Sequence, residues 1–332
     1  MSGNSSDNVY LYSASHVAPI IFSILVVISL FLHIYQYLKY RLLGMSFFML
    51  WGGAVFSCGW ILRSISTYHP ANLNLFIAQY IFIYAGPPIY ATAEYSVLGR
   101  LLSYVPMHTP LHPERVTYVF IYLGAAVEGL TAAGASLVAT TNADQLSIRQ
   151  TGYTLISVSV VLQGVVECVF IGIVALIHVR CRRSHMMTRI IRRSCMTLYG
   201  TSTLVLVRCI FRAIESFTTF STGGQCDGLC RQMLFHEWYL YVFEALPMVL
   251  YTFWLNWRHP GSLLPREKNV YLDQEGLVER LGPGWVDKRS KLHTYMDPFD
   301  LRGFMGGCPN HEEHWTQGER WPEYHREKGS AL

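Results

Sequence analysis

The sequence predicts an all-α polytopic membrane protein in which a bundle of seven transmembrane helices crosses the bilayer. Hydrophobic residues make up 51% of the 332-residue chain, although its last 75 residues are strongly polar. The first 257 residues contain seven apolar segments, each long enough to cross a hydrocarbon core about 30 Å thick as a helix. These segments are Val17–Leu38, Met45–Ile65, Leu73–Leu98, Val116–Thr140, Gly152–Val179, Cys195–Thr218 and Trp238–Trp257.

The distribution of charge predicts the orientation of the chain. Because positive residues accumulate on the cytoplasmic side of membrane proteins, we expect the N-terminus outside and the C-terminus inside the cell. Residues 1–16 then form an extracellular segment, 17–257 the transmembrane domain and 258–332 a largely irregular cytoplasmic tail. We expect no nucleic-acid partner, because the densest basic cluster lies between two spans. That cluster contains Arg180, Arg182, Arg183, Arg189, Arg192 and Arg193.

The second and third apolar segments contain polar residues, and the third also contains two prolines. Arg63 and Gln79 both fall on the outer side of the predicted membrane domain. Gly86-Pro87-Pro88 lies in the middle of the third segment, where each proline removes a backbone donor and clashes with the preceding turn. We therefore expect an interruption of this helix. Two interpretations remain open, either free carbonyls that face a cavity or a simple packing kink.

The fourth segment combines a carboxylate with a row of small residues. Glu128 follows Gly124 by one turn, so both lie on one face of the helix. Ala125, Gly129 and Ala133 are spaced four residues apart. Small residues at this spacing predict a close contact with a neighbouring helix.

The fifth and sixth segments carry polar residues at helical spacing. Gln163 and Glu167 share one face of the fifth segment. On the sixth, Arg208, Arg212 and Glu215 are four and three residues apart and form a stripe. An ionisable side chain at the centre of a bilayer costs about 2.5 to 3.5 kcal/mol on insertion scales. Each of these groups therefore requires a partner, a wet cavity or a function.

The seventh segment adds Glu244 and Pro247. Two interpretations of the charged residues remain open and are compatible: ion pairs that fix helix packing, and the lining of an outward-opening substrate path. We expect Glu244 to neutralise an arginine of the sixth segment. The candidate residues for the path are Arg208, Arg212, Glu215, Glu244, Glu128, Gln163, Glu167, Arg63 and Gln79.

Cysteine spacing predicts one disulfide and no metal site. Cys226 and Cys230 share the last outside loop, where an oxidising environment would preserve a bond between them. Two free thiols are the alternative. Cys308, His311 and His314 form a short run in the tail, but a structural zinc site needs four well-placed ligands. We expect no metal and no cofactor.

Several stretches together carry a family resemblance. They are Tyr95 to Arg100 behind Pro87, Gly134, Leu162-Gln163, Arg208 to Glu215, Glu237, Tyr241 to Met248, Asn256, and His259-Pro260-Gly261. This pattern resembles the RTA-like proteins of fungi, also called the fungal lipid-translocating exporter family. The resemblance covers residues 17 to 264, and its most specific part is Arg-x3-Arg-x2-Glu with the downstream His-Pro-Gly. It marks Pro87, Pro247, His259, Pro260 and Gly261 as structural positions.

The resemblance implies a seven-helix plasma-membrane protein that moves amphipathic lipids and contributes to lipid asymmetry or to resistance against toxic amphiphiles. Sphingoid bases and sterol-like compounds are the expected substrates, and a sphingoid amine would suit Glu128, Glu215 or Glu244. Departures from the family pattern are Phe56 and Gly124, where the family usually has acidic residues. We expect a transporter whose partners are membrane lipids, and no enzymatic activity.

A receptor of the G-protein-coupled type is the main alternative for a seven-span chain. Its motifs are missing, because Gly99-Arg100-Leu101 stands where an acidic-Arg-aromatic triplet would be expected. A retinal protein is excluded, since the predicted spans contain no lysine for a Schiff base. The sequence also lacks the G-x4-G-K-[ST] motif with which a P-loop binds ATP.

Overall fold

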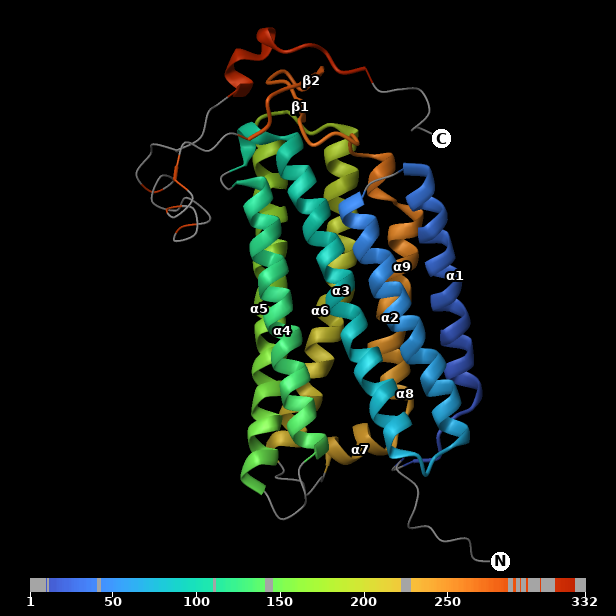
Figure 1. Ribbon diagram of the computed structural model, residues 1–332. Coiled ribbons are helices and arrows are strands. Elements are labelled where there is room, and N and C mark those ends of the chain that lie inside the picture. Colours follow the sequence, from blue (N-terminus) through green and yellow to red (C-terminus); the bar gives the residue numbers. More distant parts are fainter. Residues whose placement is uncertain are drawn as a thin grey trace, which may run out of the picture.

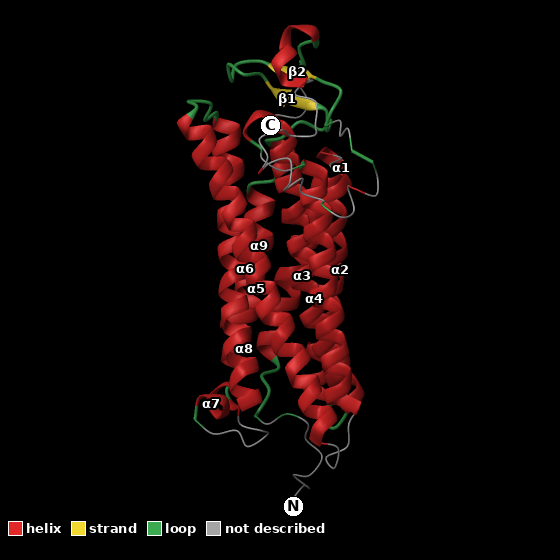
Figure 2. Cartoon of the chain, turned by 90° about the vertical axis from the view of Figure 1, so that its left-hand side faces the viewer, coloured by secondary structure: helices red, strands yellow, loops and turns green. Residues whose placement is uncertain are grey.

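The computed structural model describes residues 10, 12–40, 43–109, 112–140, 146–221, 228–285, 289–290, 293, 297, 305 and 314–325. Long helices run side by side along a common direction, with α7 at one end of the bundle and a small β-hairpin at the other (Figure 1 and Figure 2). The helices are α1 (Val17–Tyr40), α2 (Leu43–Tyr68), α3 (Leu73–Tyr104), α4 (Pro113–Thr140), α5 (Leu146–Arg183), α6 (Arg189–Ser221), α7 (Leu229–Phe235), α8 (Trp238–Leu240) and α9 (Leu246–Trp257). The shorter elements are η1 (Pro106–His108), η2 (Tyr241–Ala245), η3 (Pro260–Ser262), β1 (Val270–Leu272), β2 (Glu279–Leu281) and η4 (His314–Arg320).

Every apolar segment predicted from the sequence is helical. The first six correspond to α1 through α6, and the seventh to the consecutive elements α8, η2 and α9. Within the described residues, five helices are long and apolar enough to cross a membrane: Val17–Tyr40, Gly44–Tyr68, Pro113–Val138, Ser147–Arg183 and Arg189–Thr218. The prediction of an all-α polytopic membrane protein is confirmed. Apolar side chains such as Phe31 and Tyr122 are exposed on the outside of the bundle, as expected for a surface that faces lipid.

The seventh helical stretch contains a wide turn just before Pro247. The five residues of η2 form a π-helical turn, and Pro247 stands at the start of α9. A proline inside a helix has no N–H to donate and clashes with the preceding turn, and a π-turn is one way to accommodate it. The turn also places Glu244 in the interior, with none of its surface exposed.

The expected interruption of the third segment is not observed, because α3 continues through Pro87 and Pro88. The neighbouring helix α2 supports the helix at this point. A Cβ atom on Gly86 would lie 2.7 Å from Cδ2 of Phe56, so Phe56 packs directly against the glycine backbone. The prediction of a broken third helix was therefore wrong, since tight packing against α2 keeps the proline-containing turn helical.

A close approach between α4 and α5 involves Gly134 rather than the predicted Gly129. A Cβ atom on Gly134 would lie 2.7 Å from the carbonyl oxygen of Gly152. Gly129 has no such neighbour within 4 Å, and Ala125 and Ala133 are exposed. The predicted small-residue contact was wrong because the face that carries Gly129 points away from α5 and out of the bundle.

The part of the tail that follows α9 is folded against the end of the bundle. The imidazole Nδ1 of His259 accepts a hydrogen bond from the backbone N–H of Gly261 at 3.1 Å, and its ring stacks on Tyr40 of α1. Further on, β1 and β2 pair antiparallel and lie beside α3. The phenol of Tyr104 on α3 donates a hydrogen bond to Glu279 of β2 at 2.7 Å.

Candidate functional site

Four charged residues form an ion-pair cluster between α6 and η2, which we call the charge cluster: Arg208, Arg212, Glu215 and Glu244. The carboxylate of Glu244 accepts hydrogen bonds from Nε of Arg208 and from Nε of Arg212, both at 2.8 Å. The two arginines lie one turn apart on α6, so both guanidinium groups reach the same carboxylate. Glu244 is fully buried and each arginine side chain is only 3% exposed. This pairing offsets the cost of burying two positive charges.

Arg212 connects the charge cluster to two tyrosines of α3. It donates hydrogen bonds to Glu215 and to the phenol of Tyr84, which in turn bonds to Tyr80. The guanidinium carbon of Arg212 lies 3.8 Å from the centre of the Tyr84 ring, a cation–π distance. Its Nη2 atom is buried and has no hydrogen-bond partner among the described residues.

A cavity of about 230 Å³ lies between α3, α4, α5 and α6, and we call it the four-helix cavity. Arg212, Glu215 and Glu128 supply its charged groups, whereas Glu244 does not line it. The lining residues Tyr80 and Ile81 are 41% and 50% exposed, so the cavity reaches the outer surface of the bundle. Its apolar wall includes Ala85, Pro88, Ala132, Ile156 and Val160.

Glu128 is the charged residue of the cavity that lies outside the charge cluster. It projects from α4, and its Oε1 atom is buried without a hydrogen-bond partner in the described structure. Glu215 projects from α6 with 24% of its side chain exposed. The cavity therefore presents two carboxylates and one arginine beside an apolar wall. This arrangement suits a small polar head group attached to an apolar chain.

Two other sequence candidates lie in a separate network near the start of α1. Arg63 contacts Glu237 at 2.7 Å, Gln79 at 3.2 Å and the phenol of Tyr12 at 2.9 Å. Glu237 also accepts a hydrogen bond from the phenol of Tyr241 at 2.7 Å. Burial raises the pKa of Tyr12, against the opposing effect of Arg63. None of these residues lines the four-helix cavity.

Glu167 belongs to a third group that contains a residue not singled out from the sequence. Glu94 of α3 is fully buried and accepts a hydrogen bond from Ser202 at 3.0 Å. Glu167 lies close enough to interact with both Ser202 and Glu94. No described lysine or arginine forms an ion pair with Glu94. The cost of an ionisable group in an apolar segment was a signal that would have identified Glu94.

The remaining sequence candidates have the following positions. The amide oxygen of Gln163 accepts a hydrogen bond from Arg208 at 3.4 Å, at the edge of the charge cluster. Pro260 is buried in the turn after α9, next to His259. Cys226 and the side chain of Cys230 lie outside the described residues, so the disulfide remains a prediction. Among the described residues, no group of three His, Cys, Asp or Glu side chains is placed to hold a metal ion.

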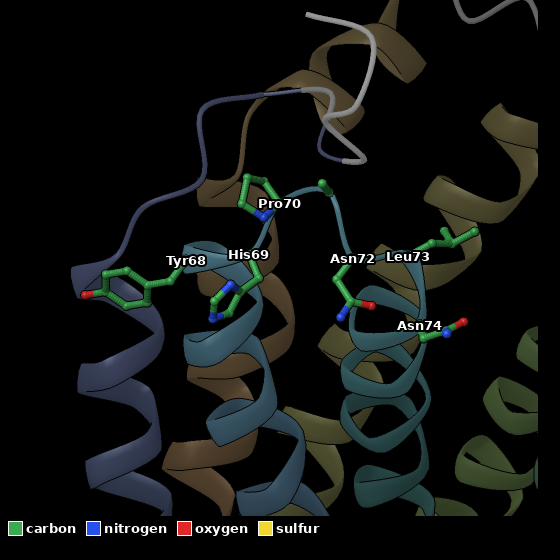
Figure 3. Close-up of a pocket in the computed structure, with 7 residues that line it drawn as sticks. Tyr68, His69, Pro70, Asn72, Leu73 and Asn74 are labelled. Carbon is green, nitrogen blue, oxygen red and sulfur yellow. The ribbon is translucent and has the colours of Figure 1, made fainter. Parts of the chain in front are cut away.

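A further hollow lies on the loop between α2 and α3, and it is lined by residues 68–74 alone. Figure 3 shows the side chains of Tyr68 and Asn74 pointing in opposite directions. The lining residues include no Arg, Lys, Asp or Glu, and their side chains do not converge on one position. The four-helix cavity is therefore the better candidate site.

The fold and this cavity define an integral membrane protein of the helical class, with buried ion pairs beside an amphipathic cavity. The chain belongs to the RTA1 like protein family, whose sequence profile matches residues 49–267. No solved structure matches the fold.

Named fungal relatives agree with this assignment. The lipid-translocating exporter-like protein RTA1 of Leptosphaeria maculans is 36% identical over 296 residues, which cover 85% of this chain. The chain spans only 56% of that relative's length. A protein of the same name from Ajellomyces capsulatus is 29% identical over 76% of this chain and 81% of its own length. The probable lipid transporter atnI of Emericella nidulans is 25% identical over 77% of this chain and 68% of its own length.

Proposed function

We propose that this protein translocates amphipathic lipids across a membrane and that the four-helix cavity binds their head groups. Two relatives are named lipid-translocating exporter-like proteins and a third a probable lipid transporter, which favours transport over both an enzymatic role and the receptor alternative. The single observation that carries the proposal is the cavity itself, where Glu128, Glu215 and Arg212 lie beside an apolar wall at the surface of the bundle.

The size of the cavity supports a head-group site rather than a site for a whole lipid. A volume of about 230 Å³ is below the range of about 300 to 1,000 Å³ typical of sites that enclose a drug-sized ligand. A head group would occupy the polar end while the apolar part of the lipid remained in the bilayer. This apolar part would pass the exposed side chains of Tyr80 and Ile81 on α3.

The charges favour an amine as the head group. Glu128 has a buried oxygen without a hydrogen-bond partner among the described residues, and Glu215 is partly exposed beside its partner Arg212. Glu244, in contrast, is fully buried and shared by two arginines. A protonated amine between Glu128 and Glu215 would gain charge-assisted hydrogen bonds. Sphingoid bases and sterol amines are therefore the proposed substrates, and Glu244 is proposed to hold the helices together.

The proposed topology has seven spans, with α3 and the stretch 238–257 added to the five helices that are long and apolar enough to cross a membrane. α3 is largely buried by its neighbours, which explains how it can contain polar residues. The stretch 238–257 consists of three consecutive pieces, α8 with 3 residues, η2 with 5 and α9 with 12. We place the N-terminus outside, the tail from residue 258 in the cytoplasm and the protein in the plasma membrane.

Leaflet-resolved translocation in liposomes tests the function. The purified chain is reconstituted, and the movement of a fluorescent sphingoid base is followed by quenching from outside, with and without a proton gradient. We expect faster movement than in protein-free liposomes, and about a tenfold loss in Glu128→Gln, because one charge-assisted hydrogen bond is worth about 1.5 to 3 kcal/mol. Glu275→Gln, in the exposed part of the tail, is the control. Equal rates with and without protein would reject the proposal.

A further inference from the structure

A second cavity, of about 410 Å³, lies at the end of the bundle that carries the β-hairpin, and we call it the tail cavity. Its walls come from the first turns of α2 and α4, from the last turns of α3, and from residues 266 and 268 of the tail. The tail and the bundle thus build this cavity together. It shares no lining residue with the four-helix cavity.

The polar side of the tail cavity has an excess of positive charge. Arg100, Arg266 and Lys268 line it, with Glu114 as the one acidic residue among its lining side chains. Lys268 and Glu114 form a long ion pair of 3.5 Å, with 67% and 54% of their side chains exposed. A pair as exposed as this is worth at most about 1 kcal/mol, so it leaves both groups available to a ligand.

Arg100 is oriented for an anion that the described chain does not supply. Its Nη2 donates a hydrogen bond to the backbone carbonyl of Arg266, which holds the guanidinium beside the tail. Its Nη1 is buried and has no hydrogen-bond partner among the described residues. No described carboxylate pairs with Arg100. A guanidinium with a free buried N–H is well suited to a phosphate oxygen.

The other side of the tail cavity is apolar and faces outward between α2 and α4. Met45 and Phe48 contribute from α2, and Tyr118 and Ile121 from α4. Tyr118 is 54% exposed, so the cavity is continuous with the outer surface of the bundle. A site with a positive end and an apolar wall on the lipid-facing surface matches an acidic lipid rather than a free anion.

We propose that the tail cavity binds an anionic glycerophospholipid, whose phosphate contacts Arg100 and Lys268 and whose acyl chain lies along Phe48 and Tyr118. Because Arg100 holds the tail through Arg266 and the tail contributes Lys268, the bound lipid fastens residues 263–272 to the bundle. This site is distinct from the four-helix cavity, and lipid binding there does not depend on whether the protein moves lipids.

Lipid retention by the purified full-length chain tests this proposal. Native mass spectrometry from detergent compares phosphatidylserine and phosphatidylglycerol with phosphatidylcholine of the same acyl chains. We expect one anionic lipid to be retained about tenfold more strongly than phosphatidylcholine. Arg100→Gln and Lys268→Gln should each reduce this preference by about tenfold, whereas Arg182→Gln, an exposed arginine in the last turn of α5, should not. Lys268 is exposed on the tail, so its variant tests the site even where Arg100→Gln fails to fold.

Two further arms identify the occupant and its effect on the tail. Millimolar inorganic phosphate should not displace the lipid, and hydrogen exchange in residues 263–272 should slow when the anionic lipid is added. Displacement by phosphate would overturn the lipid as occupant in favour of a free anion. Equal retention of phosphatidylcholine, an equal loss in Arg182→Gln, or unchanged exchange in the tail would also overturn the proposal.

Discussion

Glu244 of η2 accepts a hydrogen bond from Arg212 of α6 at 2.8 Å while both side chains lie in the interior of the bundle. The same carboxylate also bonds to Arg208, so one negative charge joins two positive charges across the interface between these helical stretches. The charge cluster thereby fixes α6 against the seventh stretch. It also aims Arg212 at the four-helix cavity.

The first prediction is that Glu244→Gln destabilises the protein. Removing one partner of a buried ion pair costs about 3 to 5 kcal/mol, because the remaining charge stays buried and unpaired. Here two guanidinium groups would lose their shared partner. We expect a lower folded yield and a lower Tm, measured by fluorescence-detected size-exclusion chromatography after heating. A variant with wild-type yield and Tm would show that Glu244 is not the structural anchor.

The second prediction uses the same substitution at a carboxylate without an ion-pair partner. Glu94 is fully buried, and its Oε2 atom accepts a hydrogen bond from the hydroxyl of Ser202. The amide oxygen in Glu94→Gln can accept the same bond, and no described arginine or lysine loses a partner. We expect the Tm of Glu94→Gln to equal or exceed that of the wild type in the same heating assay. A fall as large as that in Glu244→Gln would reveal a cation that depends on Glu94.

Much of the fold could be predicted from the sequence, because a helix that crosses a bilayer needs a long apolar run. Pairing of Glu244 with an arginine of the sixth segment also followed from the cost of unpaired charge, whereas its sharing by both Arg208 and Arg212 was not predicted. The positions of the carboxylates relative to the cavity did not follow. They depend on how each helix is rotated about its axis, and the π-turn before Pro247 changes that rotation in the seventh stretch.

Contacts that depend on helix rotation and backbone approach were the least predictable. Gly129 and Gly134 both lie among small residues of α4, yet only Gly134 meets another helix. The continuity of α3 through Pro87 depends on Phe56 from α2, which lies 31 residues earlier in the chain. Glu94 was identifiable from the sequence as an ionisable residue within an apolar segment. Its interaction with Glu167 could not be predicted, because it depends on how α3 and α5 are placed in space.

The third prediction compares alanine substitutions at these two glycines. Gly134→Ala places a methyl group 2.7 Å from the carbonyl oxygen of Gly152, which forces α4 and α5 apart. Overpacking of this kind costs about 1 to 3 kcal/mol. Gly129→Ala meets nothing within 4 Å and gains the higher helix propensity of alanine. We expect a lower Tm for Gly134→Ala and an unchanged or higher Tm for Gly129→Ala, and equal values would contradict this packing.

The fourth prediction concerns His259, in the turn that follows α9. Burial lowers the pKa of His259 to about 4, from an ordinary value of about 6.5. The neutral ring is therefore favoured in the folded protein, where its Nδ1 accepts the hydrogen bond from Gly261. Between these two pKa values the unfolded chain binds more protons than the folded protein. Stability should then decrease as the pH falls through this window, by up to about 1.4 kcal/mol per pH unit from this residue.

The variant His259→Asn separates this titration from the hydrogen bond. An asparagine side chain can accept a bond from the N–H of Gly261 but does not titrate, although it loses the stacking on Tyr40. We expect the variant to be less stable than the wild type at pH 7.5, with a smaller loss of stability between pH 7.5 and pH 5. The measurement is Tm at both pH values for both proteins, since the histidines that do not interact with His259 contribute equally to each and cancel in the difference. If the two proteins lose the same amount of stability on acidification, His259 does not remain neutral through burial.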